Sequence, residues 1–271
     1  MALRRPTELG LDMAIRVAPG AVADGRMSEP LEQPGLADAP WIVEGATQSE
    51  TRLLTIADLE ALELLHREIV GRAPLGTVAL ETTAFLAGHL GADGYTVGLF
   101  VEGQLVAYGI LGLSGAAHGR LGNLLGLSAQ CCERMALLDG VGVVPAFRGR
   151  GAHRYLNRVR ETLAERHGRQ LLAASAAPAN PVSWRNLMRL GLEVRGLARM
   201  FGGHWRYLML RDESSIPADA PAEIVGALDI ARQQRLLDLG GRGVRPGRHR
   251  GRPAVGYVAG GLAPPRDRCA R

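Results

Sequence analysis

The sequence predicts an α/β protein built around one mixed β-sheet, in which strands outnumber helices. Apolar, β-branched runs of strand length alternate with segments whose apolar residues recur at helical spacing. Two pairs of strands are joined by short turns that contain glycine, as in antiparallel hairpins. A glycine-rich turn also connects one buried strand directly to a strongly amphipathic helix.

The composition limits the core and the broad class of the protein. The chain has 271 residues, of which 46% are apolar and only 4% aromatic, so the core is expected to consist of Leu, Val, Ala and Ile. No apolar run is long enough to predict a membrane span, and Arg4 and Arg5 are not followed by the apolar segment of a secretory signal. Cys131, Cys132 and Cys269 lack metal-ligand spacing, so we expect no metal site and a reducing, cytoplasmic location.

The first ordered elements are expected after a long leader. Residues 1–46 show no sustained periodicity and are rich in Pro, Gly and Ala, which predicts a disordered leader. An ordered domain is then expected over 47–212. It begins with a strand at 51–56, an amphipathic helix at 57–70 and a second helix at 77–90.

The middle of the domain holds the most distinctive pattern. Two apolar runs around a tight turn at 95–113 predict a hairpin. The glycine-rich segment 114–134 has only a weak helical period, and we expect it to lie over a site as a mobile loop. A buried central strand is expected at 135–144, and a helix with a continuous apolar face follows and ends at His167.

The domain ends with three further elements. A strand is expected at 171–175, a helix at 180–190, and a second hairpin from the runs 192–198 and 205–210.

The C-terminal extension, 213–271, carries most of the excess charge. It has 10 Arg and 6 acidic residues, so 10 − 6 gives +4 of the formal +5 of the chain. A helical pattern at 224–239 and a strand at 254–258 predict partial order, with the Gly- and Arg-rich stretch 240–252 as an exposed loop.

The basic extension leaves two interpretations open. Residues 240–271 could contact nucleic acid or the ribosome, or they could be a solvated extension. Only Tyr257 is interleaved with these Arg residues, which argues against a base-stacking platform. An added C-terminal strand could support a homodimer, and no membrane partner is expected.

The turn after the central strand predicts an anion site. Pro145 ends the strand, and Gly149 and Gly151 let the chain turn sharply and expose successive backbone N–H groups. The helix that follows directs its N-terminus and its dipole at the same place, and Arg148 and Arg150 add positive charge. A pyrophosphate would fit there. The lysine-containing phosphate loop and the dinucleotide-binding glycine motif are both excluded by the spacing.

This segment resembles motif A of the GNAT superfamily of N-acetyltransferases, V-x-P-x-x-R-G-x-G followed by a helix. The residues that match are Val143, Pro145, Arg148, Gly149 and Gly151. The looser signature Q/R-x-x-G-x-G/A misses one position in either register. The resemblance covers about residues 50–212, and the order of the predicted elements also agrees with that family.

A second resemblance lies downstream and completes the expected cofactor site. The run from Asn180 to Ser183, with Gly191 after the helix, is similar to the family's N-x-x-S/A helix that ends in G-F. The resemblance implies acetyl-CoA, or another acyl-CoA, as cosubstrate. The residues expected to bind it are Val143, Val144, Arg148, Gly149, Arg150, Gly151, Ala152, His153, Asn180 and Ser183.

The resemblance also implies the catalytic groups. Backbone groups of Val141 and Val143 are expected to bind the pantetheine arm and the oxyanion in a gap beside the central strand. Asp139 lies on the same strand and is a candidate general base, with a structural carboxylate as the alternative. The family's usual Tyr position holds Leu187, so another acid is required, and Tyr95, Tyr108 and water are the candidates.

These observations predict an N-acyltransferase that acts on a primary amine of a small molecule or peptide, by direct attack in a ternary complex. One alternative is a CoA-binding domain of this fold that regulates without catalysis, and another is a protein that acts through its Arg-rich tail. His118, in the expected loop, could bind substrate. Cys131 and Cys132 could suggest a thiol nucleophile, although no paired His and Asp is visible.

Overall fold

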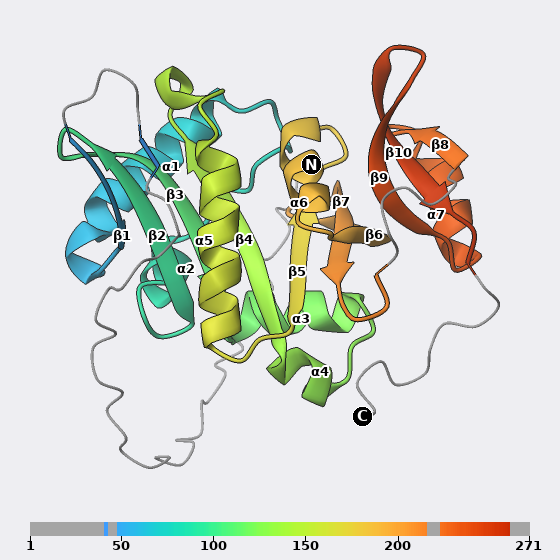
Figure 1. Cartoon of the computed structure of the whole chain (residues 1–271), viewed down its shortest axis with the longest axis horizontal. Helices are drawn as coiled ribbons and strands as arrows, with labels where there is room; N and C mark the ends of the chain where they lie inside the picture. The colour runs from blue at the N-terminus through green and yellow to red at the C-terminus, as the bar shows by residue number, and fades with distance from the viewer. Residues whose placement is uncertain (1–40, 43–47, 216–222, 261–271) are drawn as a thin grey trace, which may run out of the picture. The chain divides into compact units, whose positions relative to one another are not determined.

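A computed structural model describes residues 41–42, 48–215 and 223–260, and these form one α/β unit around a ten-stranded mixed sheet (Figure 1). The strands lie in the order β1-β2-β3-β4-β5-β7-β6-β9-β10-β8. The prediction of a mixed α/β fold is therefore confirmed. Within the described residues, no helix is both long and apolar enough to cross a membrane.

The strands are β1 Ser49–Leu53, β2 Gly94–Val101, β3 Gln104–Gly112, β4 Met135–Val143, β5 Leu171–Ala176, β6 Glu193–Met200, β7 His204–Arg211, β8 Glu223–Gly226, β9 Arg242–His249 and β10 Arg252–Val258. The helices are α1 Leu59–Arg72, α2 Thr83–Gly88, α3 Gly115–Leu124, α4 Ala129–Glu133, α5 Ala152–Arg166, α6 Pro181–Arg189 and α7 Ile230–Asp238, with short 3-10 turns at Ile56–Asp58 and Pro145–Phe147.

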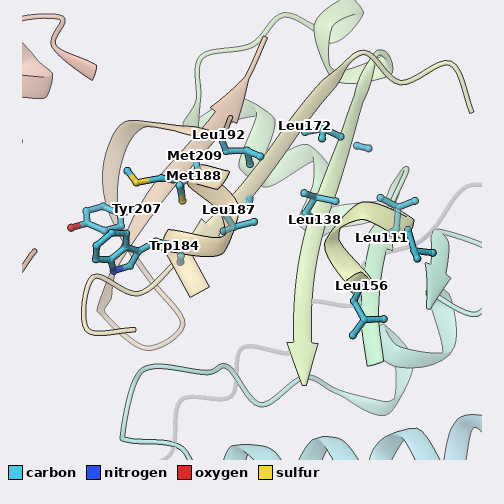
Figure 2. Packing of buried hydrophobic residues seen from close by; sticks show 14 of the residues in the cluster. Leu111, Leu138, Leu156, Leu172, Trp184, Leu187, Met188, Leu192, Tyr207 and Met209 are labelled. Atoms are coloured by element: carbon cyan, nitrogen blue, oxygen red, sulfur yellow. The ribbon is translucent and has the colours of Figure 1, made fainter. Parts of the chain in front are cut away.

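The two main helices pack on β3 and β4 and bury separate apolar clusters. Helix α5 contributes Leu156 and Val159 to a cluster that also takes in Trp184 of α6. Helix α1 contributes Leu62 and Ile69 to a second cluster with residues of β2 and β3. Figure 2 shows the first cluster bridging from α5 and β4 to α6 and β7. This packing fixes the N-termini of α5 and α6 against the central strands.

Strand β4 is the place where the sheet opens. It pairs in parallel with β5, but only through Met135–Leu137, although both strands continue beyond those pairs. In Figure 1, β4 and β5 separate toward the ends that lead into α5 and α6. On its other edge β4 pairs with β3, and this register shifts between Gly109 and Leu111, so that Asp139 and Gly140 form a β-bulge.

Arg160 of α5 fills this bulge. Its side chain is fully buried, and its Nη1 donates to the carbonyl of Ile110 at 2.7 Å and to that of Asp139 at 3.0 Å. These carbonyls belong to the two strands whose ladder is interrupted at the bulge. The guanidinium therefore supplies hydrogen bonds that the irregular register cannot make.

The segment 114–134 differs from its prediction as a mobile loop. It forms α3 and α4, which contact β4 and bury Leu121 and Cys131 in a third apolar cluster. His118 is buried there, and its Nε2 bonds to the carbonyl of Met135 at 2.9 Å. The weak periodicity arose because the helices are short and rich in glycine, while tertiary packing stabilises them.

The second predicted helix, 77–90, is shorter than expected. Its ordered helix is α2, which Thr82 caps by accepting a hydrogen bond from the Phe85 N–H at 3.2 Å. Residues 73–82 instead form a loop between α1 and α2. Several of its side chains line the cavity described below.

The C-terminal extension continues the sheet. The stretch 240–252, predicted as an exposed loop, is mostly strand β9, and it pairs with β10 and meets β6 at Val194 and Gly243. The predicted helix 224–239 also began too early, because Glu223–Gly226 is strand β8. Gln233 of α7 is fully buried and accepts hydrogen bonds from Tyr207 and Tyr257, both at 2.8 Å.

The predicted leader, 1–46, lies almost wholly outside the described residues. Trp41 is described and is buried, with 6% of its surface exposed. Its indole Nε1 donates to the carbonyl of Arg150 at 3.0 Å, and its ring lies near that of Phe147. Trp41 thus packs on the outside of the glycine-rich turn.

We predict that Arg160→Met lowers the free energy of unfolding by about 2–5 kcal/mol, because two buried carbonyls lose their donor. The matched control is Arg158→Met, since Arg158 is exposed on the same helix. Denaturant titration of both variants provides the measurement. Equal stability of the two variants would show that Arg160 does not hold the bulge.

Candidate active site

A cavity of about 610 Å³ begins where β4 and β5 separate. Its walls come from the C-terminal halves of these two strands, the turn before α5, the first turns of α6, the end of α1 and the loop 73–82. Phe201 and Arg206, from the β6–β7 hairpin, complete the lining. The volume is that of a site for a small molecule.

One end of the cavity is a row of backbone N–H groups. Gly149 and Gly151 adopt positive φ angles of 77° and 80°, which a residue with a side chain adopts only with strain. Helix α5 starts at Ala152. The first backbone hydrogen bond at this end of the helix runs from the N–H of Tyr155 to the carbonyl of Gly151. Within the described chain, the N–H groups of residues 149–154 have no carbonyl partner, so this end suits an anion.

Most of the residues predicted to bind the cofactor line this cavity. Those that do are Val143, Arg148, Gly149, Gly151, Ala152, His153, Asn180 and Ser183. Val144 and Arg150 do not line it. The N–H of Val144 instead bonds to Val106 of β3 at 3.0 Å, and the guanidinium of Arg150 lies over the ring of Phe147.

The backbone of β4 directs polar groups into the gap. Because Val144 bonds to Val106, the neighbouring pair Val143 and Ala107 is a non-hydrogen-bonded pair of the antiparallel ladder. The N–H and C=O of Val143 therefore point away from β3. The same groups of Val141, two residues earlier on the strand, point the same way. Arg148 Nε already donates to the Val143 carbonyl at 3.0 Å, which leaves the N–H groups as donors to a ligand.

Helix α6 presents its N-terminus to the same cavity. Asn180 caps it, because its side-chain oxygen accepts from the N–H of Ser183 at 3.2 Å. Leu187, which stands at the family's usual Tyr position, also lines the cavity. No hydroxyl is therefore available at that point of the site.

Two carboxyl groups lie in the cavity wall, Asp139 from the bulge and Glu81 from the loop 73–82. Burial, and then the charge of Asp139, raise the pKa of Glu81 to about 7. Burial also raises the pKa of Asp139, although the positive charge of Arg160 is among the opposing influences. A carboxyl with a pKa near 7 can accept and release a proton at neutral pH.

Tyr108 and His66 connect Glu81 to the centre of the site. The backbone N–H of Glu81 donates to His66 Nε2 at 2.9 Å, so that nitrogen carries no proton. Burial lowers the pKa of His66, which keeps the ring neutral and places its proton on Nδ1. Nδ1 lies 2.6 Å from the Tyr108 hydroxyl and donates to it, so the hydroxyl's own proton is available to another acceptor.

Gly142 explains why this tyrosine fits beside β4. Tyr108 pairs with Gly142 across the β3–β4 ladder, and a Cβ on Gly142 would overlap the tyrosine ring. The glycine that interrupts the strand pattern therefore marks a close approach of a functional side chain.

Several candidates from the sequence do not line the cavity. His118, Tyr95, Cys131 and Cys132 are all outside its lining, and Tyr95 stacks on His167 instead. Tyr155 packs against the apolar core, as its helical position indicates. The sequence does not point to Glu81, His66 or Arg206, which also line the cavity, because they come from segments that carry no motif.

Comparison with known proteins gives matches among solved structures alone. No protein-family model and no curated protein matches the chain. The structures include the ribosomal-protein-S18-alanine N-acetyltransferase of Escherichia coli, at 15% identity and a TM-score of 0.46, covering 64% of this chain and 98% of that one. A GCN5-related N-acetyltransferase of Kribbella flavida matches at 22% identity and 0.47, covering 60% and 97%.

A third match is yncA of Salmonella typhimurium with its cofactor acetyl-CoA, at 19% identity and a TM-score of 0.47, covering 64% of this chain and 99% of that chain. The first two are named as N-acetyltransferases, and yncA is named as a putative acetyltransferase. At such identities and TM-scores they assign neither a substrate nor the role of any residue.

We predict that Glu81→Gln becomes more stable relative to the wild type as the pH rises. The folded pKa of about 7 lies above the ordinary value of 4.5, so the folded chain loses stability as this carboxyl ionises between those pH values. Glutamine does not ionise. Denaturant titrations from pH 4 to pH 8 test this, with the exposed Glu60→Gln as control. Parallel curves for the wild type and Glu81→Gln would contradict a raised pKa.

Proposed function

We propose that this chain transfers an acyl group from acyl-CoA to a primary amine bound in the same cavity. The observation that carries the proposal is the continuity of one cavity from an anion-binding row of N–H groups, past the open edge of β4, to a carboxyl with a pKa near 7. A pyrophosphate needs the first feature, a pantetheine arm the second and an amine that must lose a proton the third.

The lining residues fit an acyl-CoA. The N–H groups of residues 149–154 would hold the pyrophosphate, and the N–H groups of Val141 and Val143 would bind the amide-containing arm. Asn180 and Ser183, at the start of α6, would close over that arm. Acyl-CoA supplies a thioester, whose carbonyl carbon an unprotonated amine attacks. As the tetrahedral intermediate collapses, the C–S bond breaks, and the proton that the attacking nitrogen still has to lose passes through water to the departing CoA thiolate.

Two side chains would then handle protons and charge. Glu81 accepts the proton of the incoming ammonium, because its pKa near 7 lets it be ionised and still basic at neutral pH. Burial raises the pKa of Tyr108, so its hydroxyl stays protonated and donates a hydrogen bond to the reacting thioester. The Val141 or Val143 N–H stabilises the negative charge that develops on the carbonyl oxygen.

Asp139, the base predicted from the sequence, has a supporting role in this proposal. Its carboxyl attracts the cationic amine and raises the pKa of Glu81. Its backbone carbonyl is held by Arg160 at 3.0 Å, which keeps the carboxyl at the bulge.

Acetyl-CoA is predicted to stabilise the wild-type chain by roughly 2.7 kcal/mol at a concentration about 100 times its dissociation constant. Gly151→Glu should abolish the effect, because it places a carboxylate at the row of N–H groups. A thermal-shift titration measures both.

The matched control is Gly168→Glu. Gly168 also has a positive φ, 68°, and follows α5 at its other end, so it imposes similar backbone strain of about 1–2 kcal/mol and the same charge. Gly168→Glu should retain the acetyl-CoA response. A wild-type chain that responds to no acyl-CoA would refute the proposal, and a response without amine-dependent CoA release would favour the regulatory alternative.

Glu81→Gln should lower kcat/KM by about 100-fold or more, because the amine then keeps its proton. In the wild type, kcat/KM should rise with pH up to about 7 as Glu81 ionises. Asp139→Asn should move this rise to lower pH, since removing the neighbouring charge lowers the pKa of Glu81. The measurement is CoA release across pH 5 to 9. An unchanged profile in both variants would exclude Glu81 as the base.

A further inference from the structure

Arg206 is a buried cation in the wall of the active-site cavity. It lies on β7, has 3% of its surface exposed and lines the cavity beside Phe201. Its Nη1 donates to the carbonyl of Gly76 at 2.8 Å and to that of Trp205 at 3.1 Å. These bonds aim the guanidinium and use only one of its three nitrogens.

The charge of Arg206 has no counter-charge in the described chain. None of the described carboxylates forms an ion pair with it, and burial is the one influence that lowers its pKa. Its Nε and Nη2 bond to no described residue and are not among the buried polar atoms that lack a partner, and the residue lines the cavity. Its partners in the described chain are two carbonyls and the ring of Phe201, 5.1 Å from the guanidinium carbon, and none of them is an anion. A buried cation without an anionic partner carries a desolvation cost, which an anionic ligand would offset.

Arg206 is hydrogen-bonded to the loop that also carries Glu81, the proposed base for the amine. Gly76, which accepts its hydrogen bond, and Glu81 belong to the same wall-forming loop. Arg206 is therefore hydrogen-bonded to the same short segment of the wall that carries Glu81, and both side chains belong to residues that line one cavity. The row of N–H groups that suits pyrophosphate belongs instead to the turn before α5.

We propose that Arg206 binds a carboxylate of the acceptor, and that the acceptor is therefore an amino acid or a close derivative of one. This inference rests on the proposed acyltransferase function. The carboxyls of Glu81 and Asp139 attract the amine, while Arg206 pairs with the opposite charge of the same molecule. A planar guanidinium with two unused nitrogens suits a carboxylate, and it disfavours an acceptor whose second group is another amine.

The experiment compares amino acids with their carboxamides, which retain the amine but lack the negative charge. CoA release is measured with acetyl-CoA and each of the twenty amino acids, with its amide beside it, for the full chain. The wild type should favour the acid over its amide by about 10- to 100-fold in kcat/KM for the acceptors it uses. Arg206→Met should remove this preference through KM, while the acetyl-CoA thermal shift stays unchanged.

The matched control is Arg199→Met. Arg199 belongs to the same hairpin, donates to the Gly203 carbonyl at 2.8 Å and lies over the ring of Trp205, but it is exposed and does not line the cavity. It should keep the preference for acids. Arg206→Lys keeps the positive charge but lacks the planar guanidinium, so it should recover part of the preference for acids.

Each outcome decides the proposal. A wild type that uses amides as well as acids, or an Arg206→Met variant that loses both equally, would overturn the carboxylate site and leave the acyltransferase function standing. If no acceptor releases CoA, the same pairs are titrated by thermal shift in the presence of CoA. Stabilisation by acids that Arg206→Met abolishes would then support the site without the reaction, and no such stabilisation would refute it.

Discussion

The cavity depends on the buried guanidinium of Arg160. Where β3 and β4 change register, the carbonyls of Ile110 and Asp139 lose regular ladder partners, and Arg160 donates to both. Without those bonds, buried carbonyls would make the bulge costly. With them, β4 leaves β5 after Leu137, and a stretch of its backbone on that side has no strand partner.

The parts of the site that the sequence predicted are local. In the turn from Val143 to Gly151, the functional groups are backbone N–H groups, and their direction follows from two positive-φ glycines and a helix start. Short-range patterns encode such features, which is why the candidate anion end and the start of α6 near Asn180 could be predicted. Val144 and Arg150 were also predicted to bind the cofactor, but they do not line the cavity, because the Val144 N–H pairs with β3 and the Arg150 guanidinium lies over Phe147.

The groups that the sequence could not reveal depend on distant contacts. Glu81 resembles any polar residue before a capped helix, and its raised pKa comes from burial beside Asp139. Arg206 sits in an ordinary strand pattern, and its orientation depends on the carbonyl of Gly76, 130 residues away. The order of elements was predictable because apolar periodicity is strong, whereas α3 and β9 were not, since glycine-rich and arginine-rich segments acquire structure from their neighbours.

The residue that opens the sheet also affects the proton chemistry. Burial raises the pKa of Asp139, and the charge of Arg160 is among the influences that oppose this rise. Burial, and then the charge of Asp139, raise the pKa of Glu81 to about 7. Arg160 and Glu81 are thus linked electrostatically through the carboxyl of Asp139. Burial, and then the charge of the same guanidinium, lower the pKa of His153 at the start of α5 to about 4, so that histidine is neutral at pH 7. The anion site that we propose there would therefore rest on N–H groups, while the ionisable carboxyls line the part of the cavity proposed for the amine.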